Sequence, residues 1–240
     1  MSPLAAIEPR PAELAEALPA SEYARLLGQP RARPLAGEAA DRAAAARSWY
    51  AAHARPWVAA RRVALAHLGR EQVALETGHV FRSRELAGRL LAGEAHGLLA
   101  LAVTAGAEVD AESQRLWDAG RTDEAYFLDR LGAAIAEHLV GWASVWYCRQ
   151  AASGGETVLA HLSPGCGDWD LREQARLAEA VGLGGGPLRM LDSGMLLPKN
   201  SLLAARGLSH GAGAASPEDA CRSCDLTPCR FRRAAYAGAA

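Results

Sequence analysis

Apolar residues recur at helical spacing over the first third of the chain. Residues 12–27 and 41–68 are rich in good helix formers, with apolar side chains three or four positions apart. Pro56 interrupts the second segment, because proline removes a helix hydrogen bond and clashes with the preceding turn. The pattern therefore predicts a helix within 12–27 and two helices, or one kinked helix, within 41–68. Large aromatic side chains are predicted to pack into the core: Trp49, Tyr50 and Trp57.

The middle of the chain alternates between extended and helical patterns. Residues 76–78 predict a turn beside a short strand, and Ser83 is the expected N-cap of a helix at 84–92. The apolar run that begins at residue 98 indicates a buried strand ending at Gly106. Helices are expected at 111–117 and 122–149, and the second carries one continuous apolar face.

Residues 161–208 contain two turns that bracket a helix. Pro164, Gly165 and Gly167 predict the first turn, because proline restricts φ and glycine tolerates positive φ. Asp168 or Asp170 is the expected cap of the helix that follows, which the glycines at 182 and 184–186 end. A short strand is expected at 188–191, and a second turn at 198–200 leads into further apolar residues.

The order of these elements predicts an α+β fold, with a mainly antiparallel twisted sheet and flanking helices. Closely spaced prolines at 30 and 34 indicate a linker. The sequence is accordingly divided into an N-terminal arm and linker (residues 1–45), an α+β domain (46–212) and a Cys-rich C-terminal segment (213–240).

Composition limits the classes of partner. The chain has 240 residues, of which 50% are hydrophobic, and a net charge of −1. Such a chain can bury a sizeable core, and its charge gives no reason to expect a nucleic-acid or anionic-lipid partner. No apolar run is long enough to span a bilayer, and the first residues lack the basic-then-apolar layout of a signal peptide. A cytoplasmic protein without a membrane partner is expected.

Three cysteines lie close together in the C-terminal segment. Cys221, Cys224 and Cys229 have C-x2-C-x4-C spacing, in a chain with no sign of secretion. This pattern favours metal or redox chemistry over a disulfide framework. Zinc and iron–sulfur clusters both normally take four protein ligands. The fourth ligand is expected to be Cys166, Cys148, His210 or an external group, and reduced thiols without metal remain the alternative.

Four motifs, in this order, resemble the reactivation (activation) domain of cobalamin-dependent methionine synthase, and more closely the small free-standing proteins similar to it. They are AVTAG, LDRLGAAIAEHL, SPGCGDW and LDSGMLLPKNS. The likeness covers roughly residues 45–210. In the synthase the first loop has the pattern Arg-x-x-Pro-Gly-Tyr and the second Pro-x-x-Ser. Here the first reads His161-Leu162-Ser163-Pro164-Gly165-Cys166 and the second Pro198-Lys199-Asn200-Ser201.

The resemblance implies that the two loops and the long helix bind S-adenosylmethionine. His161 occupies the position of the arginine that pairs with the carboxylate of this ligand, and histidine cannot make the same two-pronged contact. Cys166 replaces a tyrosine that faces the cobalamin. Glu137 matches a carboxylate of the long helix, or is a solvated acid on its surface. The residues expected to bind the ligand are Glu137, His161, Ser163, Pro164, Gly165, Cys166, Lys199 and Ser201.

The function that the resemblance implies is assistance in the reductive reactivation of a corrinoid protein. The expected partner is a cobalamin-carrying methyltransferase similar to methionine synthase. S-Adenosylmethionine would donate the methyl group and a cysteine-bound centre the electron. Two alternatives remain open: a non-catalytic docking module that holds structural metal, and a redox protein that works without cobalamin. No catalytic residue is assigned.

Overall fold

The computed structural model describes residues 5–29, 34–150, 156–184, 186–210 and 234–235. It contains one large antiparallel sheet with the strand order β4-β3-β2-β5-β9-β6, and β1 pairs with β2 beside this path. A separate hairpin pairs β7 with β8. The strands are β1 (Ala5–Ile7), β2 (Trp57–Leu68), β3 (Gln72–Leu75), β4 (Val80–Arg82), β5 (Gly97–Thr104), β6 (Thr157–Val158), β7 (Arg189–Met190), β8 (Leu196–Leu197) and β9 (Ser201–Ser209).

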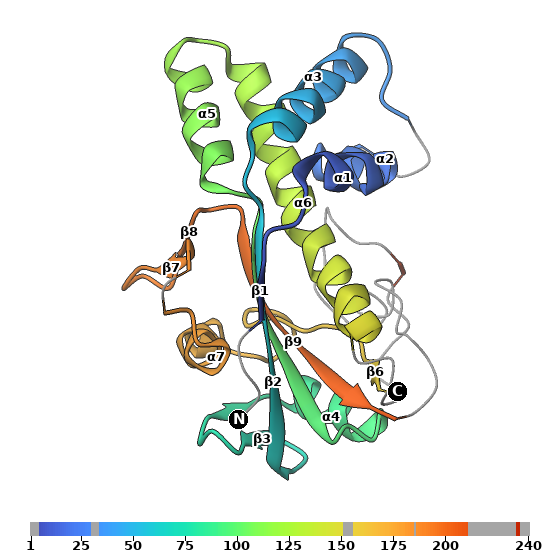
Figure 1. The fold of residues 1–240 in the computed structure, drawn as a ribbon, viewed down its shortest axis with the longest axis vertical. Helices are drawn as coiled ribbons and strands as arrows, with labels where there is room; N and C mark the ends of the chain where they lie inside the picture. The colour runs from blue at the N-terminus through green and yellow to red at the C-terminus, as the bar shows by residue number, and fades with distance from the viewer. Residues whose placement is uncertain (1–4, 30–33, 151–155, 185, 211–233, 236–240) are drawn as a thin grey trace.

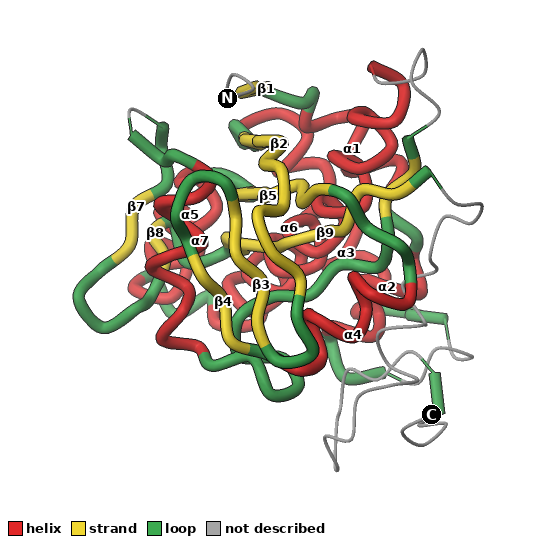
Figure 2. The backbone as a smooth tube through the Cα atoms, turned by 90° about the horizontal axis from the view of Figure 1, so that it is seen from below, coloured by secondary structure: helices red, strands yellow, loops and turns green. Residues whose placement is uncertain are grey.

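Helices cover both faces of the sheet. In Figure 1, α3, α5 and the first half of α6 form the upper part of the molecule, and the sheet lies below them with α4 and α7. Figure 2 shows the same domain from below, with the strands running between helices. The helices are α1 (Pro11–Ala17), α2 (Ala20–Leu26), α3 (Glu38–His53), α4 (Arg84–Ala92), α5 (Ala107–Asp118), α6 (Thr122–Gln150), the 3₁₀ turn η1 (Leu171–Glu173) and α7 (Gln174–Val181). The predicted α+β fold with a mainly antiparallel sheet is confirmed.

The sheet divides the hydrophobic core into two layers. One layer lies between the sheet and helices α1, α2, α3, α5 and α6, and is centred on Leu99, Leu131 and Ile135. The other lies between the opposite face and α4, α7 and the β3–β4 hairpin, and includes Phe81 and Trp169. All eight residues of β5 are buried because this central strand is covered on both faces. The long apolar run at residue 98 is thus a strand, as predicted.

One predicted helix is wrong. Residues 57–68, expected to be helical, form β2, which pairs with β5 over eight residues from Trp57 to Ala64. The alanines and arginines here are good helix formers, but the pairing with β5 and the burial of Val58 and Val63 outweigh that local preference. Pro56 does end the first helical segment, since α3 stops at His53. Tyr50 and Trp57 are buried as predicted, and Trp49 packs against the core while stacking on His53.

The described part of the expected N-terminal arm belongs to the domain. β1 pairs with β2, and α1, its C-cap and α2 contribute Leu14, Leu18, Tyr23 and Leu26 to the first core layer. The Tyr23 hydroxyl donates a hydrogen bond to the backbone carbonyl of Phe127 on α6 at 2.7 Å. The described residues of this segment are therefore not an appendage, because they cover apolar surface that the sheet and α6 would otherwise expose.

Long helix α6 spans the residues predicted for it, and its inward face lies on the sheet. Leu128, Leu131, Ile135 and Leu139 are buried, but Val145 near the C-terminal end is 53% exposed. Among the described residues, none of the helices combines the length with the hydropathy that a membrane span requires.

Candidate functional site

Residues 161–170, which we call loop 1, form a compact turn held by its own backbone. The N–H of Gly165 donates to the carbonyl of Trp169 at 2.7 Å, and the N–H of Trp169 donates to the carbonyl of Cys166 at 3.1 Å. Gly165 and Gly167 have φ values of +90° and +57°, which glycine adopts without strain. The predicted turn is thus present, and the Cys166 side chain is exposed on it.

Asp168 attaches loop 1 to helix α4. Its Oδ1 accepts hydrogen bonds from the Ser83 hydroxyl at 2.6 Å and from the N–H of Glu85 at 3.0 Å. Burial alone would raise the pKa of Asp168, but these bonds and those from Arg84 lower it. Asp170, by contrast, caps the turn η1 by accepting from the N–H of Arg172. The two aspartates proposed as alternative caps of one helix therefore cap two different helical segments.

Trp169 anchors the other end of loop 1 in the second core layer. Its ring is buried and packs edge-on against Phe81, with ring centroids 5.4 Å apart. Its indole N–H donates to Glu173 Oε2 at 2.8 Å, and the same buried carboxylate accepts from the N–H of Arg82. Loop 1 is therefore fixed by buried partners on both sides of its exposed tip.

The second turn, residues 198–200, which we call loop 2, is attached to α5 and α6. The N–H of Lys199 donates to Asp110 Oδ2 at 2.6 Å, and Lys199 Nζ lies 2.7 Å from Asp129 Oδ1. The Asn200 amide lies within 3.5 Å of both carboxylates. A Cβ atom on Gly132 would lie 2.7 Å from this amide, so only glycine lets the turn approach α6 so closely.

The pKa values of the two aspartates beside loop 2, Asp110 and Asp129, are shifted in opposite directions. Burial raises the pKa of Asp110, and the hydrogen bond from the Lys199 backbone opposes this only in part. Burial also favours the neutral form of Asp129, but the side chains of Lys199 and Arg130 outweigh it and lower its pKa. Lys199, expected to contact a ligand, thus has a carboxylate partner within the protein.

Between the two loops, the edge of β9 that faces away from β5 has no neighbouring strand among the described residues. Leu162 and Ala205 exchange both backbone hydrogen bonds, so Ala205 directs its N–H and C=O outward. Because these groups alternate along an antiparallel strand, Leu203 directs its N–H and C=O to the same edge. Continuing the register would place Pro164 opposite Leu203, but proline has no N–H to donate.

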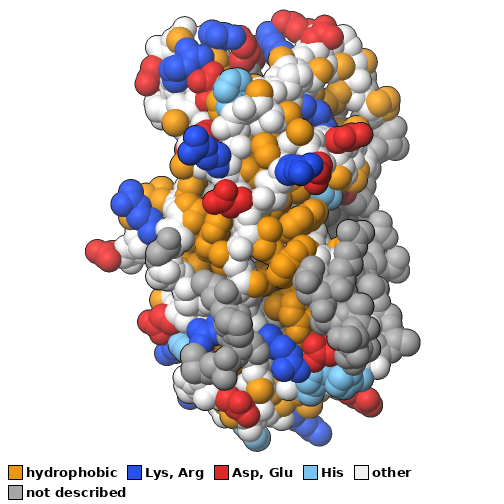
Figure 3. Space-filling view, viewed as in Figure 1, with side chains coloured by type: hydrophobic (Ala, Val, Ile, Leu, Met, Phe, Trp, Pro, Cys, Tyr) orange, Lys and Arg blue, Asp and Glu red, His pale blue; other side chains and the backbone are white. Residues whose placement is uncertain are grey.

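The register directs both backbone groups of Leu203 away from β5, and neither bonds to a loop, turn or side chain among the residues that the structure describes. Leu203 is 1% exposed, and buried backbone groups without partners are rare in native proteins. The edge of β9 between loops 1 and 2 is therefore a position where a ligand able to donate and accept hydrogen bonds would be stabilised. Figure 3 shows hydrophobic side chains gathered across the middle of one face of the molecule, at the height of the sheet in Figure 1.

The structure places most of the predicted ligand-binding residues around this edge. His161, Ser163, Pro164, Gly165 and Cys166 belong to loop 1. Lys199 lies in loop 2, and Ser201 follows it at the start of β9, where its hydroxyl donates to the carbonyl of Pro198 at 2.6 Å.

Glu137 has a partner elsewhere. It forms an ion pair with Arg25 of α2, whose side chain is 4% exposed. The ligand role expected for Glu137 thus stays a prediction.

The expected metal ligands are not brought together among the described residues. Cys221, Cys224 and Cys229 lie outside the part of the chain that the structure describes, as does the side chain of Cys148. Cys166 lies in loop 1, whereas His210 stacks on His96. The cysteine metal centre therefore stays a prediction.

Several site residues were not found from the sequence. The sequence offers Asp168 only as an alternative to Asp170 for capping the helix after loop 1, and it gives no sign of the roles of Leu203 and Glu173. Asp168 and Ser83 are 85 residues apart in the sequence, and Glu173 and Arg82 are 91 apart. Contacts between residues so far apart produce no motif that could be seen in the sequence. The proline at 164 was the one available signal for the open strand edge, because it stops β pairing.

Comparisons with known proteins identify the fold. No protein-family model and no curated protein matches the chain. Among solved structures, the chain is similar to the MetH reactivation domain bound to AdoHcy, with a TM-score of 0.64 and 14% sequence identity. The match covers 92% of this chain and 84% of that one. The chain is therefore a structural relative of the MetH reactivation domain and has the fold of that domain.

Proposed function

We propose that this protein assists the reductive reactivation of a corrinoid protein such as methionine synthase, with S-adenosylmethionine bound along the outer edge of β9. The observation that carries the proposal is the outward-directed N–H and C=O of Leu203 between loops 1 and 2, for which we find no hydrogen-bond partner in the described part of the chain. The same fold, in the MetH reactivation domain, is bound to AdoHcy, the demethylated form of S-adenosylmethionine.

The residues around the edge fit such a ligand in part. Leu203 offers a backbone donor and acceptor, which suits a ligand that carries both kinds of group. The nearby guanidinium groups have acidic partners: Arg89 lies 2.7 Å from Glu85 and Arg84 lies 3.4 Å from Asp168. In loop 1, His161 is the one basic side chain that could contact the carboxylate of S-adenosylmethionine. A single imidazole is a weaker partner for a carboxylate than a guanidinium, so modest affinity is expected.

The proposed chemistry assigns a limited role to this chain. Cob(II)alamin carried by the partner takes up one electron, and the reduced cobalt then takes the methyl group of S-adenosylmethionine, which leaves as S-adenosylhomocysteine. The electron would come from the cysteine-bound centre predicted at Cys221, Cys224 and Cys229, or from an external reductase. Loop 1 and loop 2 would orient the methyl donor, and the exposed tip at Cys166 would contact the partner.

Binding of S-adenosylhomocysteine, measured by calorimetry, tests the ligand part of the proposal. Wild type is expected to bind weakly, and His161→Arg to bind about tenfold or more tightly, because it restores a bidentate contact to the carboxylate. His67→Arg adds the same charge to an exposed position on β2 and serves as the control. Absence of binding to both wild type and His161→Arg would remove S-adenosylmethionine from the proposal.

The corrinoid part needs a separate measurement. The absorption spectrum of a cob(II)alamin-loaded methionine synthase lacking its own reactivation domain is followed with a reductant and S-adenosylmethionine, with and without this protein. Formation of methylcobalamin only when the protein is present would support the role. Unchanged cob(II)alamin would favour the docking-module alternative if the two proteins bind each other, and the cobalamin-independent redox alternative if they do not.

A further inference from the structure

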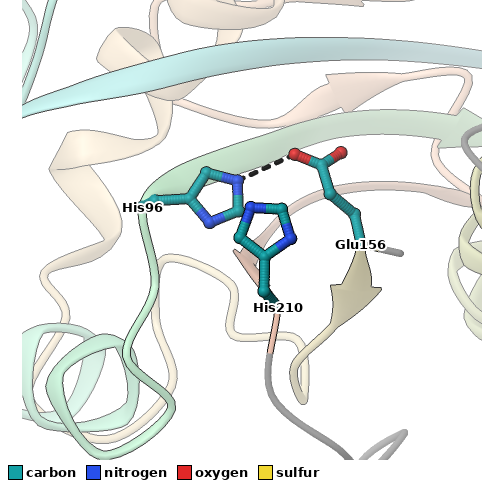
Figure 4. Close-up of side chains that lie close together, drawn as sticks. All are labelled: His96, Glu156 and His210. Atoms are coloured by element: carbon teal, nitrogen blue, oxygen red, sulfur yellow. Dashed lines mark hydrogen bonds and ion pairs between the residues drawn. The ribbon is translucent and has the colours of Figure 1, made fainter. Parts of the chain in front are cut away.

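Three potential metal ligands meet at one end of the sheet, in a place that the proposed function does not use. His96 precedes β5, Glu156 precedes β6 and His210 follows β9. One ligand atom from each lies within 4.8 Å of the others. Figure 4 shows the two imidazole rings and the carboxylate turned toward one another, and the rings stack with centroids 4.4 Å apart.

The sheet holds the backbone of these residues in place. The N–H of His96 donates to the carbonyl of Leu208 at 2.9 Å, beside the last β5–β9 pair, Gly97–Leu208. Thr157, next to Glu156, pairs with Ser209, next to His210. Because β5, β9 and β6 are neighbours in the sheet, the three side chains are delivered to one place by hydrogen-bonded strands.

Both carboxylate oxygens of Glu156 are held in place by neighbouring side chains. Its Oε2 accepts a hydrogen bond from the Tyr147 hydroxyl at 2.9 Å, while Oε1 lies 2.8 Å from His96 Nε2. A second carboxylate oxygen held by a hydroxyl is the kind of outer contact that orients metal-binding carboxylates.

We propose that His96, Glu156 and His210 bind a divalent transition-metal ion of the zinc type. Two imidazoles and one carboxylate form a donor set that suits such an ion and leaves one coordination position open. Ligand atoms about 2.0–2.2 Å from a tetrahedral zinc ion are ~3.3 Å apart, so the three side chains must draw closer when the ion binds. Because an imidazole binds a metal through a lone pair in its ring plane, the exposed His210 ring must also rotate out of its stack on His96. His210 is exposed, which gives an ion access from solvent.

Arg62 is the competitor for this position. Its guanidinium lies 2.6 Å from Glu156 Oε1 and 3.4 Å from His96 Nε2, so it neutralises the same carboxylate that the ion would use. The Arg62 side chain is 41% exposed and can turn into solvent when an ion binds. Removing this positive charge is expected to tighten metal binding, whereas a purely structural ion-pair network would not respond in this way.

The test is made on a full-length variant in which Cys221, Cys224 and Cys229 are all replaced by Ser, so that thiolates of the C-terminal segment cannot hold the ion. Binding of Co²⁺ is followed by its visible absorption and binding of Zn²⁺ by competition. One equivalent per chain is expected. Adding His96→Ala or His210→Ala should weaken binding at least about tenfold. His67→Ala, which removes an exposed histidine on β2, should leave it unchanged.

A second test adds Arg62→Gln to the same triple-Ser variant. This substitution should raise the affinity for the metal ion several-fold. Circular dichroism of each variant checks that folding is retained, and His210 is exposed, so its replacement should not disturb the core. The proposal is overturned if the variant with the three C-terminal cysteines replaced binds no ion, or if binding survives both histidine replacements unchanged. It does not depend on the proposed function, because neither S-adenosylhomocysteine nor a corrinoid enters the measurement.

Discussion

Asp168 and Ser83, 85 residues apart in sequence, are joined by a hydrogen bond of 2.6 Å from the Ser83 hydroxyl to the Asp168 carboxylate. Ser83 is the N-cap of α4, and its hydroxyl oxygen also accepts from the N–H of Leu86 at 3.0 Å. Asp168 adds acceptors for the N–H groups of Arg84 and Glu85. The shape of loop 1 and the start of α4 therefore depend on each other.

Asp168→Ala is expected to lower the free energy of unfolding by about 1–2 kcal/mol, because it leaves the first N–H groups of α4 without their acceptor. Asp170→Ala, which removes the cap of the exposed turn η1, is the control and should cost less. Urea unfolding of both variants checks this. Equal losses would indicate that the contact between loop 1 and α4 contributes little.

The pH dependence of stability follows from the lowered pKa of Asp168. In the unfolded chain an aspartate has a pKa of about 3.9, above that of Asp168 in the fold, so folding favours the ionised form. The stabilisation is fully present above the unfolded pKa and is lost as pH falls through the folded pKa. The stability difference between wild type and Asp168→Asn should thus be constant near neutral pH and shrink below about pH 4. A difference that grows in acid would contradict the assignment.

Two glycines of α6 are expected to respond oppositely to replacement by alanine. Gly132→Ala places a methyl group 2.7 Å from the Asn200 amide and 2.8 Å from Val109, and should destabilise the protein by about 1–3 kcal/mol. Gly141→Ala meets no atom within 4 Å and should stabilise it by about 0.5–1 kcal/mol, because alanine is the better helix former. Thermal unfolding compares them, and a stabilising Gly132→Ala would argue against the close approach of loop 2 to α6.

Lys199→Met should raise the pKa of Asp129, since the lysine ammonium is one of the groups that lower it. NMR titration of the carboxyl carbons gives this value directly. Asp110 serves as an internal comparison, because its strongest contact with Lys199 is to the backbone N–H, which the substitution keeps. An unchanged Asp129 pKa would mean that Lys199 does not hold the pair in solution.

Glu137→Gln separates a structural role from a ligand role. Removing the charge that faces Arg25, whose side chain is 4% exposed, should destabilise the protein by about 1–3 kcal/mol, even though Glu22 remains 3.0 Å away. Glu124→Gln, which breaks an exposed pair with Arg121, should have little effect. Unchanged stability together with weaker binding of S-adenosylhomocysteine would instead assign Glu137 to the ligand.

Local chemistry in the sequence determined the elements that stand on their own. The cap at Ser83, the buried strand from residue 98, the long helix α6 and the turns at Pro164 and Pro198 were all predictable, because capping, apolar runs and proline geometry act over a few residues. The order of elements and the two loop motifs also sufficed to recognise the fold.

Only the tertiary structure decided what depends on contacts between distant residues. β2 is a strand because β5 pairs with it, although its composition suits a helix. The segment at 5–29 belongs to the core because the sheet and α6 offer it apolar surface to cover. The open edge at Leu203 arises where β9 has no neighbouring strand, and the cluster of His96, Glu156 and His210 arises where separate strands end together. The residues of such sites have no characteristic spacing in the sequence, because pairing of the strands in the sheet brings them together.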